Sequence, residues 1–236
     1  LNTNSNVSIT GNGAGSVNDI NFSGFEKVQL GDGQNVASVS SSAAGNVDGG
    51  NGYDTLATGN LNVALNGNGS GNVGNLNFTG FEQVTGDNNG SVTVDGNASV
   101  ASSRAGSVGN TSFSGINNLT GSGTADTLNT NSNVSITGNG AGSVNDVNFS
   151  GFEKIQLGDG QNVATVSDTA AGNVDGGSNY DTLSTGNLTV ALNGNGSGNV
   201  NGLAFSGFEQ VTGNNNGSIS VNGNASVASS RAGSVG

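Results

Sequence analysis

The sequence predicts an all-β protein, a parallel β-helix solenoid with stacked coils of about 18 residues. Three observations predict it: the chain repeats itself, apolar and polar residues alternate over short segments, and glycine pairs separate those segments. Alternation with a period of two indicates short strands that bury one face. Helices are disfavoured, because each internal glycine costs a helix about 1 kcal/mol relative to alanine.

The largest repeat covers most of the chain. Residues 1–109 align with residues 128–236 without a gap, and the two copies differ at 17 positions. The apolar differences only exchange Val and Ile, whereas two aspartates become asparagine. This pattern favours selection for packing over selection for chemistry. We expect two large repeats, residues 1–127 and 128–236, in one continuous solenoid.

A shorter motif sets the predicted coil length. Its five copies start at Phe22, Phe78, Phe113, Phe149 and Phe205, each followed by Ser-Gly or Thr-Gly. The spacings between copies are 56, 35, 36 and 56 residues, close to multiples of 18. If the copies stack in one column, the chain forms about 13 coils at a spacing of about 4.8 Å.

The corner residues fit this solenoid but also permit another all-β fold. Gly-Asn, Asn-Gly and Asp-Gly pairs supply the positive φ angles that tight corners need. Asn-Gly also favours two-residue antiparallel turns, so an array of hairpins is the competing arrangement. The short strands and even period favour the β-helix. In it we expect rows of phenylalanine in the core and asparagine side-chain ladders between coils.

Composition excludes several classes of function. The 236 residues contain no His and no Cys, which removes the usual general base, the usual zinc ligand and any disulfide. Sixteen acidic residues against four basic ones give a net charge of −12, which argues against nucleic acid as a partner. No apolar run approaches the roughly 20 residues of a spanning helix, so we expect no membrane insertion. We also expect no catalytic activity.

One local motif points to a metal. The run Gly49-Gly-Asn-Gly-Tyr-Asp54-Thr-Leu fits the calcium nonapeptide of β-helix repeats, whose carboxylate and carbonyl oxygens suit Ca²⁺. Less complete versions contain Asp181 and Asp126. Calcium sites of this kind lie between consecutive nonapeptides, and these are isolated. The alternative is a glycine corner whose aspartate accepts hydrogen bonds from turn amides. Asp54, Asp181 and Asp126 are the calcium candidates, and we expect no other cofactor.

Two further sets of residues invite a sugar-related interpretation. A glutamate occurs in four motif copies, at Glu26, Glu82, Glu153 and Glu209. A glycosidase pair needs carboxylates about 5–9.5 Å apart, whereas copies three coils apart in one column lie roughly 14 Å apart. We therefore expect solvated or capping groups.

The chain has two tyrosines, Tyr53 and Tyr180, at equivalent places in the large repeat. We expect them to pack at the corners of the coils. Exposed contacts for a sugar are the alternative.

Taken together, the motifs resemble the repeat regions of large secreted bacterial adhesins. The pattern Phe-Ser-Gly-Phe-Glu-x-Val, with Gly-x-x-x-Asp-Thr-Leu, is similar to filamentous-haemagglutinin-like exoproteins of two-partner secretion and to RTX-type adhesins. The resemblance implies a right-handed β-helical stalk, secreted to the bacterial cell surface or the biofilm matrix. We expect glycans or neighbouring matrix components as partners, and self-association through the solenoid ends.

The expected function is that of a structural stalk segment that mediates attachment or aggregation. The alternative is a self-assembling surface-layer or fibre subunit, bridged by calcium. A β-helical carbohydrate enzyme lacks its acid–base residues here, and an ice-binding face lacks its regular threonine ranks.

Overall fold

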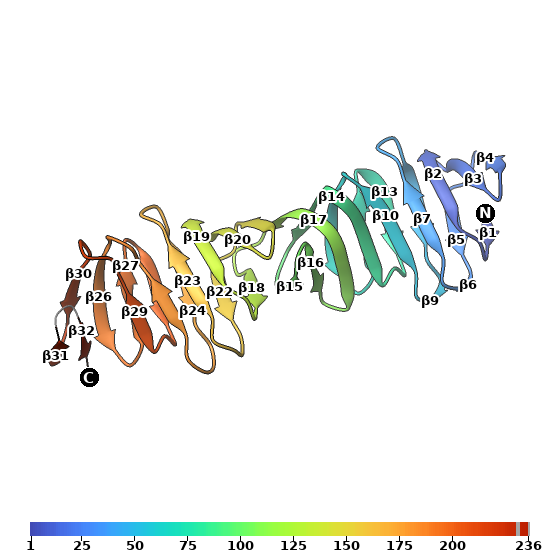
Figure 1. Ribbon diagram of the computed structural model, residues 1–236. Coiled ribbons are helices and arrows are strands. Elements are labelled where there is room, and N and C mark those ends of the chain that lie inside the picture. Colours follow the sequence, from blue (N-terminus) through green and yellow to red (C-terminus); the bar gives the residue numbers. More distant parts are fainter. Residues whose placement is uncertain (230–231, 236) are drawn as a thin grey trace. The chain divides into compact units, whose positions relative to one another are not determined.

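The computed structural model describes residues 1–229 and 232–235 (Figure 1). Those residues form strands and turns without a helix, which confirms the all-β prediction. No helix in the described part of the chain is long and apolar enough to cross a membrane. The chain divides into two compact units, Leu1–Ser122 and Gly123–Gly236, close to the predicted repeat boundary. A continuous solenoid across that boundary stays a prediction.

The strands of the first unit are β1 (Asn2–Thr3), β2 (Val7–Gly11), β3 (Ala14–Val17), β4 (Ile20–Phe22), β5 (Lys27–Leu30), β6 (Asp32–Gly33), β7 (Val36–Val39), β8 (Ala44–Asp48), β9 (Asn51–Gly52), β10 (Thr55–Gly59), β11 (Asn62–Gly67), β12 (Ser70–Val73), β13 (Asn75–Thr79), β14 (Gln83–Val94), β15 (Ala98–Ser102), β16 (Ala105–Val108) and β17 (Thr111–Gly121).

The strands of the second unit are β18 (Thr127–Thr130), β19 (Val134–Gly138), β20 (Ala141–Val144), β21 (Val147–Ser150), β22 (Lys154–Leu157), β23 (Val163–Val166), β24 (Gly172–Asp175), β25 (Thr182–Ser184), β26 (Thr189–Gly194), β27 (Ser197–Val200), β28 (Leu203–Ser206), β29 (Gln210–Thr212), β30 (Ser218–Val221), β31 (Ala225–Ser229) and β32 (Ala232–Val235).

Within each unit, successive turns of the chain stack strand on strand in parallel register, as the sequence predicts. In the first unit, Val28 of β5 lies beside Val47 of β8, which in turn lies beside Phe78 of β13. All three side chains are buried, so each turn closes the apolar face of the next. The parallel β-solenoid is therefore confirmed.

The predicted coil length is wrong. Turns contain about 28 residues, and the described residues make about eight turns instead of 13. The shortest step is close to the predicted one, since Asn35 contacts Asp54, 19 residues further along the chain. Longer steps reach the 32 residues that separate Asn12 from Ala44. The difference arises because some turns carry an additional antiparallel excursion.

Each excursion is a meander of antiparallel strands, as in β11, β12 and β13. The first strand of this meander also pairs in parallel with the next turn, through Val63 and Val92. Hairpins, the competing prediction, are thus embedded in the parallel solenoid. Gly71 faces Phe78 across the meander, where a Cβ would lie 2.0 Å from the carbonyl oxygen of Ala64 and 2.7 Å from the ring carbon Cζ, so glycine makes room for both. The same pairing joins Gly15 to Phe22, Gly106 to Phe113, Gly142 to Phe149 and Gly198 to Phe205.

Phenylalanine fills the core, but not as the predicted rows. Phe78 and Phe81 contact each other edge to face, with ring centroids 6.1 Å apart, and both are buried. The neighbour of Phe78 in the adjacent turn is Val47 rather than another ring. An asparagine contact between turns does occur, since Asn77 Nδ2 lies 3.4 Å from Asn46 Oδ1.

Candidate functional site

The most polar part of the interior lies where two different sequence motifs stack. Asp54-Thr-Leu56 leads into β10, and Glu82-Gln-Val84 leads into β14, the strand of the next turn. Leu56 faces Val84 in this parallel pair. Three copies of the Phe-containing motif, those with Glu82, Glu153 and Glu209, stack on an Asp-Thr-Leu strand, whereas the copy at Phe113 stacks on β14. The prediction that the copies share one column is therefore wrong. The separation estimated for the glutamates from a common column does not apply.

Asp54 is bound to both neighbouring turns. Its Oδ1 accepts a hydrogen bond from the backbone N–H of Asn35 at 2.8 Å. Its own N–H donates to Glu82 Oε2 at 2.8 Å, and its carbonyl oxygen accepts from Glu82 N and Gln83 N at 3.1 Å. The carboxyl group is completely buried. Asp54 thus satisfies backbone amides and joins three consecutive turns.

The second unit repeats this arrangement at Asp181 and, in part, at Asp126. Asp181 Oδ1 accepts from Asn162 N at 2.8 Å, and Asp181 N donates to Glu209 Oε2 at 2.7 Å. Asp126 N donates to Glu153 Oε2 at 2.7 Å, while its Oδ2 accepts from the N–H of the nearby corner residue Gly123. The recurrence agrees with the alternative interpretation of these aspartates as groups that bind turn amides.

Burial also changes the acidity of two of these groups. Desolvation raises the pKa of the Asp54 carboxyl, the hydrogen bond from Asn35 opposes that effect, and the charge of Glu82 adds to it. Desolvation raises the pKa of Asp181 in the same way. One carboxyl oxygen of each aspartate, Oδ2, has no hydrogen-bond partner, nor do the amide nitrogens Nδ2 of Asn35 and Asn162.

This geometry does not suit calcium. Ca²⁺ takes about six to eight oxygen ligands, whereas Asp54, Asp126 and Asp181 each use an oxygen on a backbone amide. Nowhere in residues 1–229 and 232–235 do three or more acidic side chains gather to hold a metal ion. Calcium at these aspartates stays a prediction for which the described residues supply no ligand set.

The glycines of the calcium-like motif have a packing role. A Cβ at Gly52 would collide with the carbonyl oxygen of Gly33, in the strand pair β6–β9. Gly50 has a φ of 97°, and a Cβ there would collide with the carbonyl oxygen of Leu30. Close approach of two backbones therefore explains these glycines without an ion. Asn179 replaces Gly52 in the second unit, where the strand pair is reduced to an isolated bridge.

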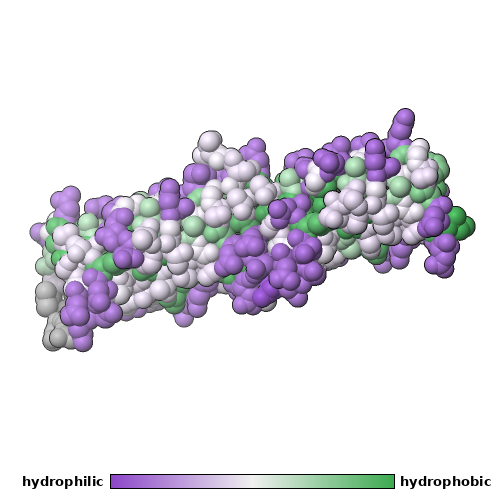
Figure 2. All heavy atoms as spheres, turned by 90° about the horizontal axis from the view of Figure 1, so that it is seen from above, coloured by the Kyte–Doolittle hydropathy of each residue, from purple (hydrophilic) through white to green (hydrophobic). Residues whose placement is uncertain are grey.

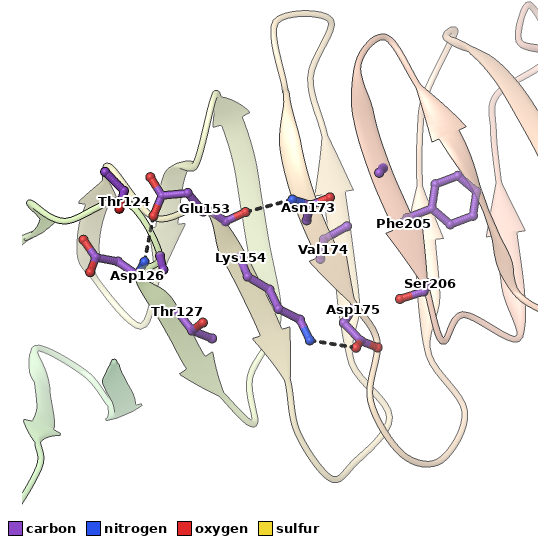
Figure 3. A pocket seen from close by; sticks show the side chains of 12 residues that line it. Thr124, Asp126, Thr127, Glu153, Lys154, Asn173, Val174, Asp175, Phe205 and Ser206 are labelled. Atoms are coloured by element: carbon purple, nitrogen blue, oxygen red, sulfur yellow. Dashed lines mark hydrogen bonds and ion pairs between the residues drawn. The ribbon is translucent and has the colours of Figure 1, made fainter. Parts of the chain in front are cut away.

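A shallow open depression of about 560 Å³ lies beside Asp126 in the second unit (Figure 3). Its charged side chains are engaged in an ion pair or in hydrogen bonds with backbone N–H groups. Lys154 Nζ lies 3.1 Å from Asp175 Oδ2, and Asn173 Nδ2 donates to the carbonyl oxygen of Glu153 at 3.2 Å. Ala204 stands here where the first unit has Asn77. The depression therefore offers paired, structural side chains rather than a reactive group.

The two tyrosines are exposed, so the prediction that they pack at corners is wrong. Tyr53 is 47% exposed and Tyr180 is 51% exposed. The hydroxyl of Tyr53 lies 3.3 Å from Ser112 Oγ. Nearby, Asn51 Nδ2 donates to Asp32 Oδ1 at 3.0 Å. An exposed ring beside polar groups agrees with the alternative, a contact for a sugar, which stays a prediction.

Sequence reasoning missed Asn35 and Asn162, the partners of the buried aspartates. A signal was present, because both copies of the large repeat keep an asparagine, in Gln-Asn-Val, 19 residues before the aspartate of Asp-Thr-Leu.

No family model, curated protein or solved structure matches the chain. The resemblance to secreted adhesins therefore rests on the motifs alone.

Proposed function

We propose that this chain is a structural stalk segment of an extracellular bacterial adhesin or biofilm-matrix protein. The observation that carries the proposal is the use of its recurrent carboxylates. Each of Asp54, Asp126 and Asp181 is at most 1% exposed and accepts a backbone amide hydrogen bond that holds the chain's corners or turns. A chain whose regularly repeated carboxylates hold its corners and stacked turns together is suited to a mechanical role.

The surface supports the same proposal. Figure 2 shows a face on which hydrophilic and weakly polar residues predominate, with hydrophobic residues in small separate patches. Hydroxyl and amide groups recur on neighbouring strands, as where Thr189 Oγ1 lies 2.7 Å from Ser218 Oγ. Many weak hydrogen bonds of this kind favour multivalent attachment to glycans over tight binding at one site.

Multivalent display tests the attachment role. Beads coated with the chain should adhere to glycan-coated surfaces, while the single chain in solution should bind weakly. The matched control is a chain with Tyr53→Ala and Tyr180→Ala, which removes the exposed rings and leaves the core intact. Beads that neither adhere nor aggregate at any coating density would contradict the proposal.

A second candidate is the self-assembling surface-layer or fibre subunit bridged by calcium. It is favoured by the net charge of −12 and by exposed carboxylates such as Asp19, Asp32 and Asp87. Calcium between chains would relieve the repulsion between these acidic surfaces. Light scattering should then rise with millimolar Ca²⁺ and fall with a chelator. If light scattering changes with neither Ca²⁺ nor the chelator, the result supports the stalk instead.

A further inference from the structure

An uncharged polar face lies beside Tyr53 in the first unit. Thr55 of β10 faces Gln83 of β14, and Gln83 faces Ser112 of β17, in three successive turns. Side chains alternate along each strand, so a second row of partly exposed residues runs beside the first. Both rows consist of hydroxyl, amide or methyl side chains and carry no charge. The second row contains Ala57, Thr85 and Ser114.

The ring of Tyr53 lies along this face. Its backbone belongs to the turn of β10, where Tyr53 precedes Thr55 by two residues. Its hydroxyl lies 3.3 Å from Ser112 Oγ, which is two turns further along the solenoid. Neighbouring strands lie about 4.8 Å apart, so the side chain has to extend over the intervening strand of Gln83. Ser112 Oγ donates to the carbonyl oxygen of Glu82 at 3.1 Å, which leaves the tyrosine hydroxyl as the donor to Ser112.

Tyr53 is exposed although turns of the chain flank it on both sides. Its N–H donates to the carbonyl oxygen of Gly33 in the preceding turn at 3.2 Å, and its hydroxyl reaches Ser112 beyond the following turn. The residue is nevertheless 47% exposed. The exposure therefore comes from the place of the ring on the outer face. A ring that is held at its backbone and at its tip loses little conformational freedom when a ligand covers it.

The second unit repeats the arrangement. Tyr180 is 51% exposed and precedes Thr182 by two residues. Thr182 Oγ1 donates to Gln210 Oε1 at 3.4 Å, the same distance as from Thr55 Oγ1 to Gln83 Oε1. The tyrosine, the threonine and the glutamine are identical in the two copies, although the copies differ at 17 positions. The exposed ring and its polar neighbours therefore recur as a unit.

We propose that each tyrosine and the polar face beside it bind an uncharged glycan, with one sugar ring stacked on the aromatic ring. A pyranose ring presents C–H groups on one face and hydroxyl groups around its edge. The negative face of an aromatic ring attracts such C–H groups, while the side chains of Thr55 and Gln83 offer donors and acceptors to the sugar hydroxyls. The net charge of −12 disfavours acidic glycans. This site rests on the proposed attachment to glycans and supplies the side chains for it.

Tyrosine fluorescence tests the site, because the chain has two tyrosines and no tryptophan. Cellohexaose and chitohexaose serve as uncharged probes, and hexagalacturonic acid serves as the acidic probe. We expect a saturable change in tyrosine emission with at least one uncharged probe and none with the acidic probe. Tyr180→Leu leaves Tyr53 as the emitting residue, and Tyr53→Leu leaves Tyr180. Each single variant should still respond, because each unit carries its own site.

Substitution of both rings measures their contribution. In isothermal titration calorimetry with the probe that binds, the chain with Tyr53→Leu and Tyr180→Leu should bind about tenfold more weakly. The chain with Tyr53→Phe and Tyr180→Phe keeps the aromatic faces and should bind within about twofold of the original chain. Asn77→Ala is the control on another strand, because the second unit already has Ala204 there, and it should change nothing. Unchanged thermal midpoints show that the variants are folded.

The proposal is overturned if neither uncharged probe changes the emission, if the acidic probe binds equally well, or if the leucine and phenylalanine versions behave alike. Its failure differs from failure of the attachment role. Beads coated with the leucine version that still adhere to glycan surfaces would remove the tyrosine site and leave attachment standing. Beads coated with the original chain that do not adhere, while the emission still responds to a probe, would contradict attachment and leave the site standing.

Discussion

Val92 and Ile219 occupy equivalent places in the large repeat, yet Val92 is 0% exposed and Ile219 is 60% exposed. Their strands have almost the same sequence and the same partner strand on one side. What differs is the other side, where β17 covers Val92. The comparison teaches that burial in this fold is given by the next turn, because no single turn buries its own apolar face.

A second comparison between the units concerns which residues change. Gly52 becomes Asn179 and Asn77 becomes Ala204, both at positions on the surface of the turns. Asp54 and its counterpart Asp181 are unchanged and fully buried. The repeat therefore tolerates substitution at these exposed positions, although Asn77 and Gly52 each contact a neighbouring turn, and keeps the buried aspartate that joins three turns.

The largest effect should come from breaking the core. Phe78→Asp places a charge at a site that is 1% exposed, and we expect a loss of about 4 kcal/mol or more. Neighbouring turns should unfold cooperatively with it, because they depend on each other. Phe25→Asp is the matched control at a ring that is 38% exposed and should cost less than half as much. Thermal melting by circular dichroism measures both, and an unchanged midpoint for Phe78→Asp would refute its place in the core.

Two matched substitutions test the comparison of β14 with β30 directly. Val92→Asp buries an unpaired carboxylate between two strands and should destabilise the first unit by about 3 kcal/mol. Ile219→Asp changes an exposed side chain and should cost less than about 1 kcal/mol. Urea denaturation gives both free energies of unfolding. Equal losses would mean that the next turn does not determine burial.

Substitution of a glycine that lies opposite phenylalanine tests how tightly the meanders are packed. A Cβ at Gly142 would lie 1.9 Å from the carbonyl oxygen of Ser135 and 2.8 Å from Phe149 Cζ, so Gly142→Ala should cost about 2 kcal/mol through overpacking. In the same meander, a Cβ at Gly138 would lie 3.4 Å from Ala141 Cβ, and Gly138→Ala should stay within about 0.5 kcal/mol of the original chain. If both variants unfold at the same urea concentration as the original chain, the close packing of strand and ring around Gly142 does not require glycine.

The smallest expected effect concerns pH. Burial raises the pKa of Asp54 above its usual value near 3.8, so the folded state binds the proton more tightly than the unfolded state. Its contribution to stability is present at low pH and is lost as pH rises through the folded-state pKa. Asp54→Asn removes the ionisable group, so the stability lost by the original chain as pH rises is not lost by the variant. The variant's free energy of unfolding relative to the original chain should therefore increase from pH 3 to pH 7.

Asp87→Asn is the control for that pH series, because Asp87 is exposed and the second unit already has asparagine there. It measures the effect of removing a surface carboxylate over the same pH range. A gain for Asp54→Asn that is no larger at pH 7 than at pH 3 would contradict the raised pKa.

The sequence was enough to predict the all-β class, parallel stacking and the buried position of Phe78. Alternating apolar residues, glycine corners and internal repetition all pointed to that answer. Coil length could not be predicted from motif spacing alone, because 56 residues are about three steps of 18 but also two steps of 28. The seven-residue interval from Gly71 to Phe78, and its four equivalents, was the overlooked sign of antiparallel meanders.

The aspartates were predictable only as alternatives, as calcium ligands or as acceptors for turn amides. Deciding between them required the register, since Asn35 and Glu82 approach Asp54 from two different turns. The exposure of Tyr53 could not be predicted from the sequence pattern either, because a corner residue can point inward or outward without changing the period of the repeat.

Cysteine cross-linking tests the turn length most directly, in a chain that has no cysteine of its own. Thr55 and Gln83 face each other in neighbouring turns. The Cα atoms of facing residues in adjacent strands lie within the separation of about 4.4–6.8 Å that a disulfide needs. Thr55→Cys with Gln83→Cys should therefore form a disulfide under mild oxidation. Gln83→Cys with Ala101→Cys, a pair 18 residues apart, should not. Cross-linking of the second pair in place of the first would contradict the stacking described above.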